Sequence, residues 1–192
     1  MSTARAKRAV EEGNLIDRML PLVLSSPVRE PVPGLPKRLQ SLFRELAKQD
    51  PGRDPDAIED LIWAIWIDHP DAGVASEMAV ACQAMVDGEL ARARSVLDGL
   101  VERFPQWPEV WNKRAIIAFI EKRDAACLAD IERTLQLEPR HFGAVAGFGQ
   151  VCLRQGRPAE AKAAFEVALQ LDPHLRGLRG LISRLDLGRK LH

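Results

Sequence analysis

Residues 142–175 read FGAVAGFGQVCLRQGRPAEAKAAFEVALQLDPHL, and the same pattern of residue classes occurs twice before, each time 34 positions upstream. Proline marks the period at Pro105, Pro139 and Pro173. Three columns of small residues and one of larger apolar residues share it: Ala81, Ala115 and Gly149; Ala84, Ala118 and Cys152; Ala93, Cys127 and Ala161; and Leu97, Ile131 and Phe165. Five columns that agree in residue class predict a helical repeat.

The residue types in these columns fit two antiparallel helices in each unit. Small side chains let the helices approach closely, and the larger column, one turn later, fills the space where they diverge. Each proline ends the second helix. Between the helices, Gly88 and Gly156 supply a left-handed stop, whereas Lys122 holds this place in the middle unit. The sequence therefore predicts three helical hairpins, at 74–107, 108–141 and 142–175, in an all-α, right-handed superhelix.

The period and the columns resemble the tetratricopeptide repeat (TPR) superfamily. The unit 142–175 follows the family pattern most faithfully, and the middle unit supplies Trp111 at its start. The segment 111–145 is similar to the core of a group of short bacterial TPR proteins, in which WNKRA, ADIERTL and LEPRHFGA follow one another. The resemblance covers residues 37 to 185, and it implies protein interaction rather than a defined chemistry.

The segments around the repeats carry helical patterns of their own. Residues 37–68 predict a helix pair, with Asp54 as the N-cap and Pro55 at the first position of its second helix. Regularly spaced leucines predict a capping helix over 175–187 with a basic outer face. We therefore expect a TPR-like domain at 37–192. The preceding residues, 1–36, are expected to form a short helix over 4–19 and a stiff, proline-rich linker from Pro21 onward.

Residues 19–24 are apolar and lie outside the repeats, so we expect them to dock within the molecule. One acceptor is the inner groove near Met85, Phe119 and Leu153, where the segment would compete with a partner. The alternatives are a frayed terminus and a helix packed on the convex face. This apolar run is too short, and too interrupted by Pro21, for a secretory signal or a membrane span. We expect a cytoplasmic protein, with the periplasm left open.

The resemblance implies that the first helix of each unit faces a partner, because these helices line the concave side of such a superhelix. Carried over by register, the lining residues are Met78, Cys82, Met85, Asn112, Ile116, Phe119, Ile120, Gln150, Leu153 and Arg154, with Val86 and Ala146 beside them. This surface is more apolar than charged, and methionine-rich grooves adapt to helices or extended peptides. The predicted function is a non-catalytic adaptor for a protein or peptide.

Arg114 interrupts an apolar column, in which Val80 and Phe148 hold the equivalent positions. A buried guanidinium without a partner would be strongly destabilising, so we expect a carboxylate beside it. By register, Asp130 and Glu132 are the nearest candidates for a structural ion pair. The alternative is that Arg114, together with neighbouring polar residues, contacts an acidic ligand.

Composition and motifs argue against other classes of protein. The chain of 192 residues has 27 basic and 27 acidic side chains and lacks the basic excess typical of nucleic-acid binders, although an RNA-binding helical repeat is kept as the alternative function. Its cysteines, Cys82, Cys127 and Cys152, form no CxxC pair, and no two histidines stand at i, i+4. We therefore expect no metal, no cofactor and no enzymatic activity.

Charge is segregated along the chain. Residues 50–71 hold seven acidic side chains, whereas residues 174–192 hold five basic ones. These two segments could meet head to tail, or they could remain as solvated helix ends.

Overall fold

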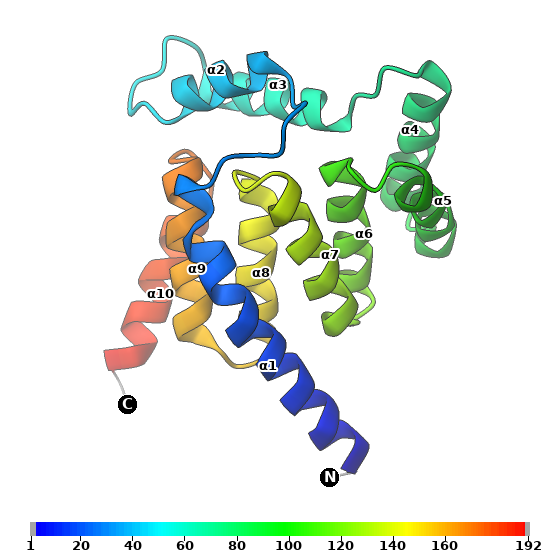
Figure 1. Ribbon diagram of the computed structural model, residues 1–192. Coiled ribbons are helices and arrows are strands. Elements are labelled where there is room, and N and C mark those ends of the chain that lie inside the picture. Colours follow the sequence, from blue (N-terminus) through cyan, green and yellow to red (C-terminus); the bar gives the residue numbers. More distant parts are fainter. Residues whose placement is uncertain (1–2, 191–192) are drawn as a thin grey trace.

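The computed structural model describes residues 3–190, with side chains from 14 to 187. Within that part of the chain the regular structure is helical throughout, which confirms the all-α prediction (Figure 1). The elements are α1 (Thr3–Leu24), the 3-10 turn η1 (Ser26–Val28), α2 (Lys37–Leu46), α3 (Pro55–Ile67), α4 (Ala72–Val86), α5 (Leu90–Arg103), α6 (Pro108–Ile120), α7 (Asp124–Leu137), α8 (Phe142–Arg154), α9 (Pro158–Leu171) and α10 (Leu178–Lys190).

Three helical hairpins, α4–α5, α6–α7 and α8–α9, form the body of the fold, and they follow the 34-residue period. All three turns contain a left-handed residue: Gly88 at φ 77°, Lys122 at φ 57° and Gly156 at φ 69°. The residue that follows the left-handed one then donates its backbone N–H to a carbonyl near the end of the first helix, in each hairpin at 2.8 Å. The shared hydrogen-bond pattern explains why a lysine adopts a glycine conformation in the middle unit.

The repeat columns lie where the sequence predicts them, between the two helices of each hairpin. Ala81, Ala115 and Gly149 are buried on the first helices, and Leu97, Ile131 and Phe165 are buried on the second. The first helices form one layer, since α6 contacts both α4 and α8.

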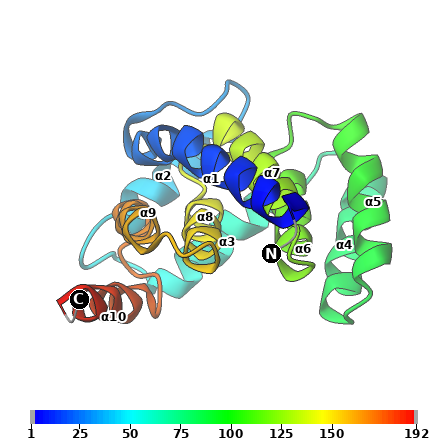
Figure 2. The ribbon, with the colours of Figure 1, turned by 90° about the horizontal axis from the view of Figure 1, so that it is seen from below.

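α1 packs on the outer layer of the repeats, across α7 and α9. Figure 2 shows α1 on one side of the repeats and α3 on the other. The convex-face alternative for the amino-terminal segment is therefore confirmed, and docking in the inner groove was wrong. The apolar side chains of Ile16, Met19 and Val23 are buried there, and Arg18 pairs with Glu132 at 2.7 Å.

The helix boundaries of this segment also differ from the prediction. α1 continues through Pro21 to Leu24, whereas the sequence predicted a linker from Pro21 onward. Proline costs a helix one backbone hydrogen bond and crowds the preceding turn. Pro21 is exposed, whereas Ile16, Met19 and Val23, which follow one another at about one-turn spacing on another face of the helix, are buried. Burial of that apolar face offsets the loss, so packing overrides the local signal.

The pair α2–α3 lies across the ends of the repeats in Figure 1. Asp54 caps α3 by accepting the amide of Asp56, with Pro55 at the first helical position, as predicted. The pair contacts both the middle and the last hairpin: the Trp107 indole donates to the Trp66 carbonyl at 2.7 Å, and the rings of Phe43 and Phe142 are 6.3 Å apart.

The last helix, α10, packs against α9 through a leucine-rich face that begins at the buried Leu178. It starts three residues later than predicted, because Gly177 takes a left-handed φ of 79° just before it. The two charged segments meet within one molecule: Arg176 pairs with Asp56, and His174 Nε2 lies 3.0 Å from the Lys48 carbonyl oxygen. The acidic and basic segments thus join α2–α3 to the carboxyl-terminal end of α9.

Candidate functional site

The inner layer of α4, α6 and α8 carries the residues that the sequence predicts for a partner groove. Ile116 and Ile120 are 38% and 52% exposed, and Arg154 is exposed as well. Five others are partly exposed: Cys82, Met85, Phe119, Gln150 and Leu153. These side chains therefore reach the surface of the inner layer.

The prediction was wrong for Met78 and Asn112, which are buried. Met78 packs in the apolar cluster formed by α4, α5 and α6. Asn112 donates from Nδ2 to Glu109 Oε2 at 3.1 Å and serves an internal polar network. A partner could not touch either side chain without displacing core residues.

An apolar patch remains on the carboxyl-terminal halves of the three inner helices. It consists of Met85, Val86, Ile116, Phe119, Ile120 and Leu153, and we call it the inner apolar patch. Val86 is 81% exposed and stands one repeat before Ile120, while Met85, Phe119 and Leu153 share a register at successive 34-residue steps. Single exposed apolar residues are common on protein surfaces, but a set at equivalent positions of neighbouring helices forms a patch.

Arg154 borders this patch and is engaged by the protein itself. Its guanidinium lies 3.8 Å from the centroid of the Phe119 ring, and its Nη1 donates to the Phe119 carbonyl at 2.8 Å. It also pairs with Asp124 at the start of α7. The cation therefore joins the last two hairpins, and its charge is already balanced.

α3 covers the opposite end of the inner layer, near the amino termini of α6 and α8. The space beside Gly143 is filled by Trp63: a β-carbon at position 143 would lie 2.8 Å from Trp63 Cη2. The Trp66 ring stacks on that of His141, with centroids 4.1 Å apart and planes 7° from parallel. α3 thus shortens the surface open to a partner, which the sequence did not predict.

A buried polar network lies beneath α3. His141 Nδ1 accepts the amide of Ala144 at 3.1 Å, so the neutral ring carries its proton on Nε2, which lies 2.8 Å from Glu109 Oε2. Lys113 Nζ is 3.0 Å from the other carboxylate oxygen. Burial raises the pKa of Glu109, but His141 and Lys113 outweigh it, and the pKa lies below its ordinary value. The network keeps a buried carboxylate charged and fixes α6 to α8.

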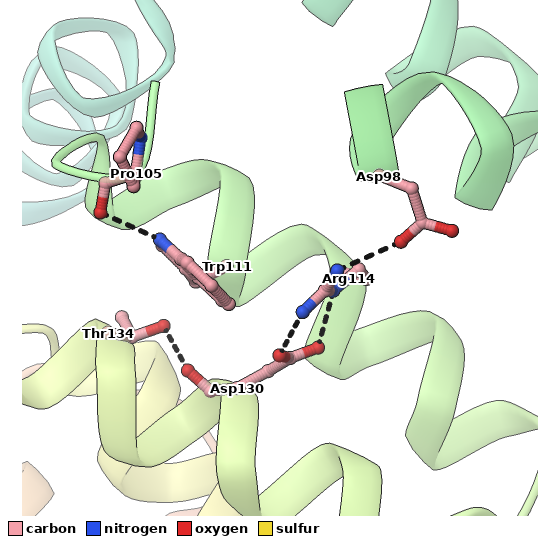
Figure 3. Close-up of polar contacts among 6 residues, drawn as sticks. All are labelled: Asp98, Pro105, Trp111, Arg114, Asp130 and Thr134. Atoms are coloured by element: carbon pink, nitrogen blue, oxygen red, sulfur yellow. Dashed lines mark hydrogen bonds and ion pairs between the residues drawn. The ribbon is translucent and has the colours of Figure 1, made fainter. Parts of the chain in front are cut away.

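Arg114 lies in the ion-pair network that Figure 3 shows. Its Nε and Nη2 bond the two carboxylate oxygens of Asp130 at 2.9 and 2.7 Å, and its Nη1 donates to Asp98 at 2.9 Å. The guanidinium carbon Cζ of Arg114 lies over the Trp111 ring, 4.9 Å from the centroid of that ring. The predicted structural pair with Asp130 is confirmed, and Arg114 links α5 of the first hairpin to α6 and α7 of the second.

The other predicted partner of Arg114 was wrong, because Glu132 pairs with Arg18 of α1. The sequence did not predict the contact between Arg114 and Asp98. Only carboxylates of the hairpin that contains Arg114 were considered as partners, and Asp98 belongs to the preceding hairpin. Burial raises the pKa of Asp130 although Arg114 opposes it, so the ion pair offsets only part of the cost of burying this carboxylate.

Neither a metal-binding cluster nor a membrane-spanning segment is found in the described part of the chain. No group of three His, Cys, Asp or Glu side chains within residues 3–190 is arranged to hold a metal ion. Over the same residues, no helix combines the length and the apolar character needed to cross a bilayer. The cysteines described, Cys82, Cys127 and Cys152, are free thiols.

Stacked helical hairpins with a shared inner face define a helical-repeat protein of the interaction class. Comparison with known proteins identifies the family. Residues 147–175 match the tetratricopeptide repeat model. A TPR repeat-containing protein of Rhizobium etli is 31% identical over 140 residues, which are 71% of this chain and 67% of that protein. The chain belongs to the TPR repeat-containing proteins, a family typically without catalytic activity, and the comparisons indicate no enzyme family.

Proposed function

We propose that this protein is a non-catalytic adaptor that binds a protein or peptide through the inner apolar patch. The observation that carries the proposal is the exposure of Val86, Ile116 and Ile120 on neighbouring inner helices, at 81%, 38% and 52%. Burial of apolar side chains of this size on binding is favourable by about 25 cal/mol per Å² of area removed from water. The proposed patch therefore offers a driving force for association.

The chemistry of the patch favours an apolar partner segment. Lys113 and Arg154, the nearest cations on these helices, are paired with Glu109 and Asp124. They therefore add little net charge for a carboxylate or a phosphate. Half-buried Met85 supplies a flexible, polarisable side chain that can adapt to different apolar groups. An amphipathic helix or an apolar extended peptide fits this surface, while the RNA-binding alternative gains no support from it or from the comparisons.

We also propose that the protein resides in the cytoplasm. Burial raises the pKa of the Cys127 and Cys152 thiols to about 12, so both stay protonated and unreactive at neutral pH. Free, protonated cysteines on packed helices support a reducing compartment.

The test is affinity capture of bacterial proteins on the immobilised chain, compared among three forms. Ile116→Asp and Ile120→Asp place a charge in the inner apolar patch, and Val28→Asp places one at an equally accessible site outside it, where Val28 is 84% exposed. We expect a partner that is retained by the native chain and by Val28→Asp and lost from both isoleucine variants. A partner retained equally by all forms would reject the patch as the binding surface, and nuclease-sensitive capture would favour RNA.

A further inference from the structure

A concave site separate from the inner apolar patch lies where the connections around α3, α5 and α6 meet. Its cavity of about 470 Å³ is lined by residues 34–36, by the end of α3 with residues 68–70, and by the α5–α6 connection at 103–108. Ligand sites typically enclose about 300–1,000 Å³. The residues of the inner apolar patch do not line this cavity, which we call the Trp107 pocket.

Three rings, those of His69, Phe104 and Trp107, line the Trp107 pocket, and their side chains are partly exposed. The His69 ring lies 4.7 Å from that of Phe104 and 5.0 Å from that of Trp107, measured between centroids. The Trp107 indole donates to the Trp66 carbonyl at 2.7 Å, which fixes the largest ring. His69 Nδ1 accepts the amide of Asp71 at 3.1 Å, as the neutral imidazole does. The rings therefore offer π-electron surface without a charge of their own.

The charges of the lining differ in whether they are paired. Among the described residues that line the pocket, Asp68 and Arg103 carry a formal charge. Arg103 pairs with Glu77 of α4. Asp68 is exposed at the end of α3, and its carboxylate has no ion pair within residues 14–187. Arg133 donates to the Pro105 carbonyl at 3.1 Å from outside the lining. The unbalanced charge of the lining is therefore negative.

Helix dipoles add little to this balance, because helix ends of both signs meet at the pocket. The carboxyl-terminal ends of α3 and α5 bring partial negative charge, whereas the amino-terminal ends of α2 and α6 bring partial positive charge. The Asp68 carboxylate therefore decides the sign of the ligand. A cation is attracted to this site, and an anion is repelled.

The chain itself places a cation on the aromatic wall. The guanidinium carbon of Arg103 lies 5.3 Å from the centroid of the Phe104 ring. The face of an aromatic ring attracts cations, and the attraction grows when the cation leaves water. Asp68 directly precedes His69, so the free carboxylate belongs to the part of the lining that holds the His69 and Trp107 rings. We expect a bound cation to contact that part, beside Arg103.

Two backbone carbonyls at the pocket already accept hydrogen bonds. The Trp66 carbonyl accepts the Trp107 indole, and the Pro105 carbonyl accepts the Trp111 indole and Arg133. A primary ammonium has three N–H donors, and it is costly to bury any of them without a partner. A quaternary ammonium has none, and its methyl groups suit an apolar lining. The prolines of that lining are Pro36, Pro70, Pro105 and Pro108.

We propose that the Trp107 pocket binds a quaternary ammonium group. Asp68 supplies the counter-ion, the His69 and Trp107 rings contact the methyl groups, and the charge of Arg103 opposes the ligand. Two sources share this chemistry: a small molecule such as choline, and a trimethylated lysine side chain. The site is separate from the inner apolar patch, so its failure would leave the proposed adaptor function unaffected.

The experiment is a titration of the full chain with choline chloride at constant ionic strength, followed in nitrogen–proton correlation spectra. We expect the indole N–H signal of Trp107 to shift along a saturation curve. The backbone amide of Gly156, in the turn at the other end of α8, should not shift. The neutral compound 3,3-dimethylbutan-1-ol has the shape of choline and should bind about tenfold more weakly, because it lacks the charge. Ethanolamine, a primary ammonium, should also bind more weakly.

Three variants test the roles of the charges. Asp68→Asn should weaken choline binding about fivefold, because it removes the counter-ion. Asp60→Asn removes the same charge from an exposed position of α3 outside the lining, and it should leave binding unchanged. Arg103→Gln should tighten binding about twofold, because it removes a cation from the wall and leaves Glu77 unpaired. A loss of folding could not produce tighter binding.

The outcomes separate this proposal from its competitors. Absence of a saturable shift with choline would overturn it, and so would equal affinity for 3,3-dimethylbutan-1-ol, which would make the cavity a site for neutral apolar molecules. Equal effects of Asp68→Asn and Asp60→Asn would overturn the assigned counter-ion. Acetyl-trimethyllysine amide distinguishes the sources: tighter binding than choline assigns the site to a protein side chain, and weaker binding assigns it to a small molecule. Either order supports the quaternary ammonium site.

Discussion

Gly149 on α8 leaves room for the ring of Phe165 on α9: a β-carbon at position 149 would lie 2.8 Å from Phe165 Cδ1 and 2.9 Å from Cζ. Phe165 is fully buried and cannot swing aside without opening the core. We therefore expect Gly149→Ala to destabilise the protein by about 1–3 kcal/mol in urea unfolding, because overpacking forces strained rotamers or separated helices.

Gly147 provides the matched control, since it lies two residues away on the same helix. A β-carbon there would meet Ile131 Cδ1 at 3.6 Å, an ordinary contact. Gly147→Ala should therefore stabilise the protein by about 0.5–1 kcal/mol, the usual gain from replacing glycine within a helix. If the two variants unfold at the same urea concentration, the close approach of α8 and α9 at Gly149 is refuted.

Lys122 holds the left-handed position in the turn between α6 and α7, where the other two hairpins have glycine. A side chain in this conformation costs roughly 1–2 kcal/mol from the contact of its β-carbon with the following carbonyl oxygen. We expect Lys122→Gly to raise the free energy of unfolding by about 1 kcal/mol. Lys122→Ala keeps the β-carbon and should change stability by less than about 0.5 kcal/mol. Equal gains from both variants would assign the effect to the lysine side chain instead.

The Arg114–Asp130 pair should show the cost of a buried charge that loses its partner. Asp130→Ala should destabilise the protein by about 3 kcal/mol, whereas Asp98→Ala, whose carboxylate is half exposed, should cost less than about 1 kcal/mol. Arg114→Met should also destabilise, because the Asp130 carboxylate is buried and cannot turn to water. The double variant Arg114→Met, Asp130→Leu should recover part of the loss. A larger cost for Asp98→Ala would contradict this order.

The repeats could be predicted from the sequence because their determinants are local or periodic. Gly149 and Phe165 occupy columns whose residue size alone indicates the distance between helices, and Pro173 marks the end of α9 at the predicted place. The partner of Arg114 also followed from register, since Asp130 faces it within the same hairpin. Only Asp98 was missed, because it required the packing of one unit on the next.

The positions of α1 and α3 could not be predicted, because they depend on contacts between segments far apart in the sequence. Pro21 indicates a break locally, yet α1 continues through it since three apolar side chains are buried on α7 and α9. Trp66 is buried on α3, but nothing in its own helix indicates His141 as its neighbour. In the same way, nothing in the sequence indicates that α3 covers one end of the inner layer, where Trp63 fills the space beside Gly143.

Burial of α1 on the outer layer leads to a prediction for hydrogen exchange. Met19 is buried against the repeats, while Leu24 on the same helix is half exposed. Met19→Asp should release α1, because an unpaired carboxylate is costly in an apolar contact. Amides of α7 and α9 should then exchange faster, with little change in α4. Leu24→Asp should leave exchange at the level of the native chain. Faster exchange confined to the inner helices would contradict the observed place of α1.

The last prediction concerns Glu59 on α3, which lies near Asp172 at the end of α9. Burial is the main cause that raises the pKa of Glu59 to about 7, and Asp172 and Asp56 add repulsion. The pKa of the buried Asp172 is raised as well, chiefly by burial. In the unfolded chain Glu59 titrates near its ordinary value of 4.5. The folded state thus binds the proton more tightly, and this contribution to stability is complete below pH 4.5 and is lost as the pH rises through about 7.

Glu59→Gln should remove this pH dependence, because the amide resembles the protonated acid at every pH. Urea unfolding of the native chain and the variant should give similar free energies near pH 4.5, and the variant should become the more stable as the pH rises to 8. Asp60→Asn is the control: Asp60 is exposed on the same helix, and its replacement should give a curve parallel to that of the native chain. Parallel curves for Glu59→Gln and the native chain would show that Glu59 does not bind its proton more tightly in the folded state.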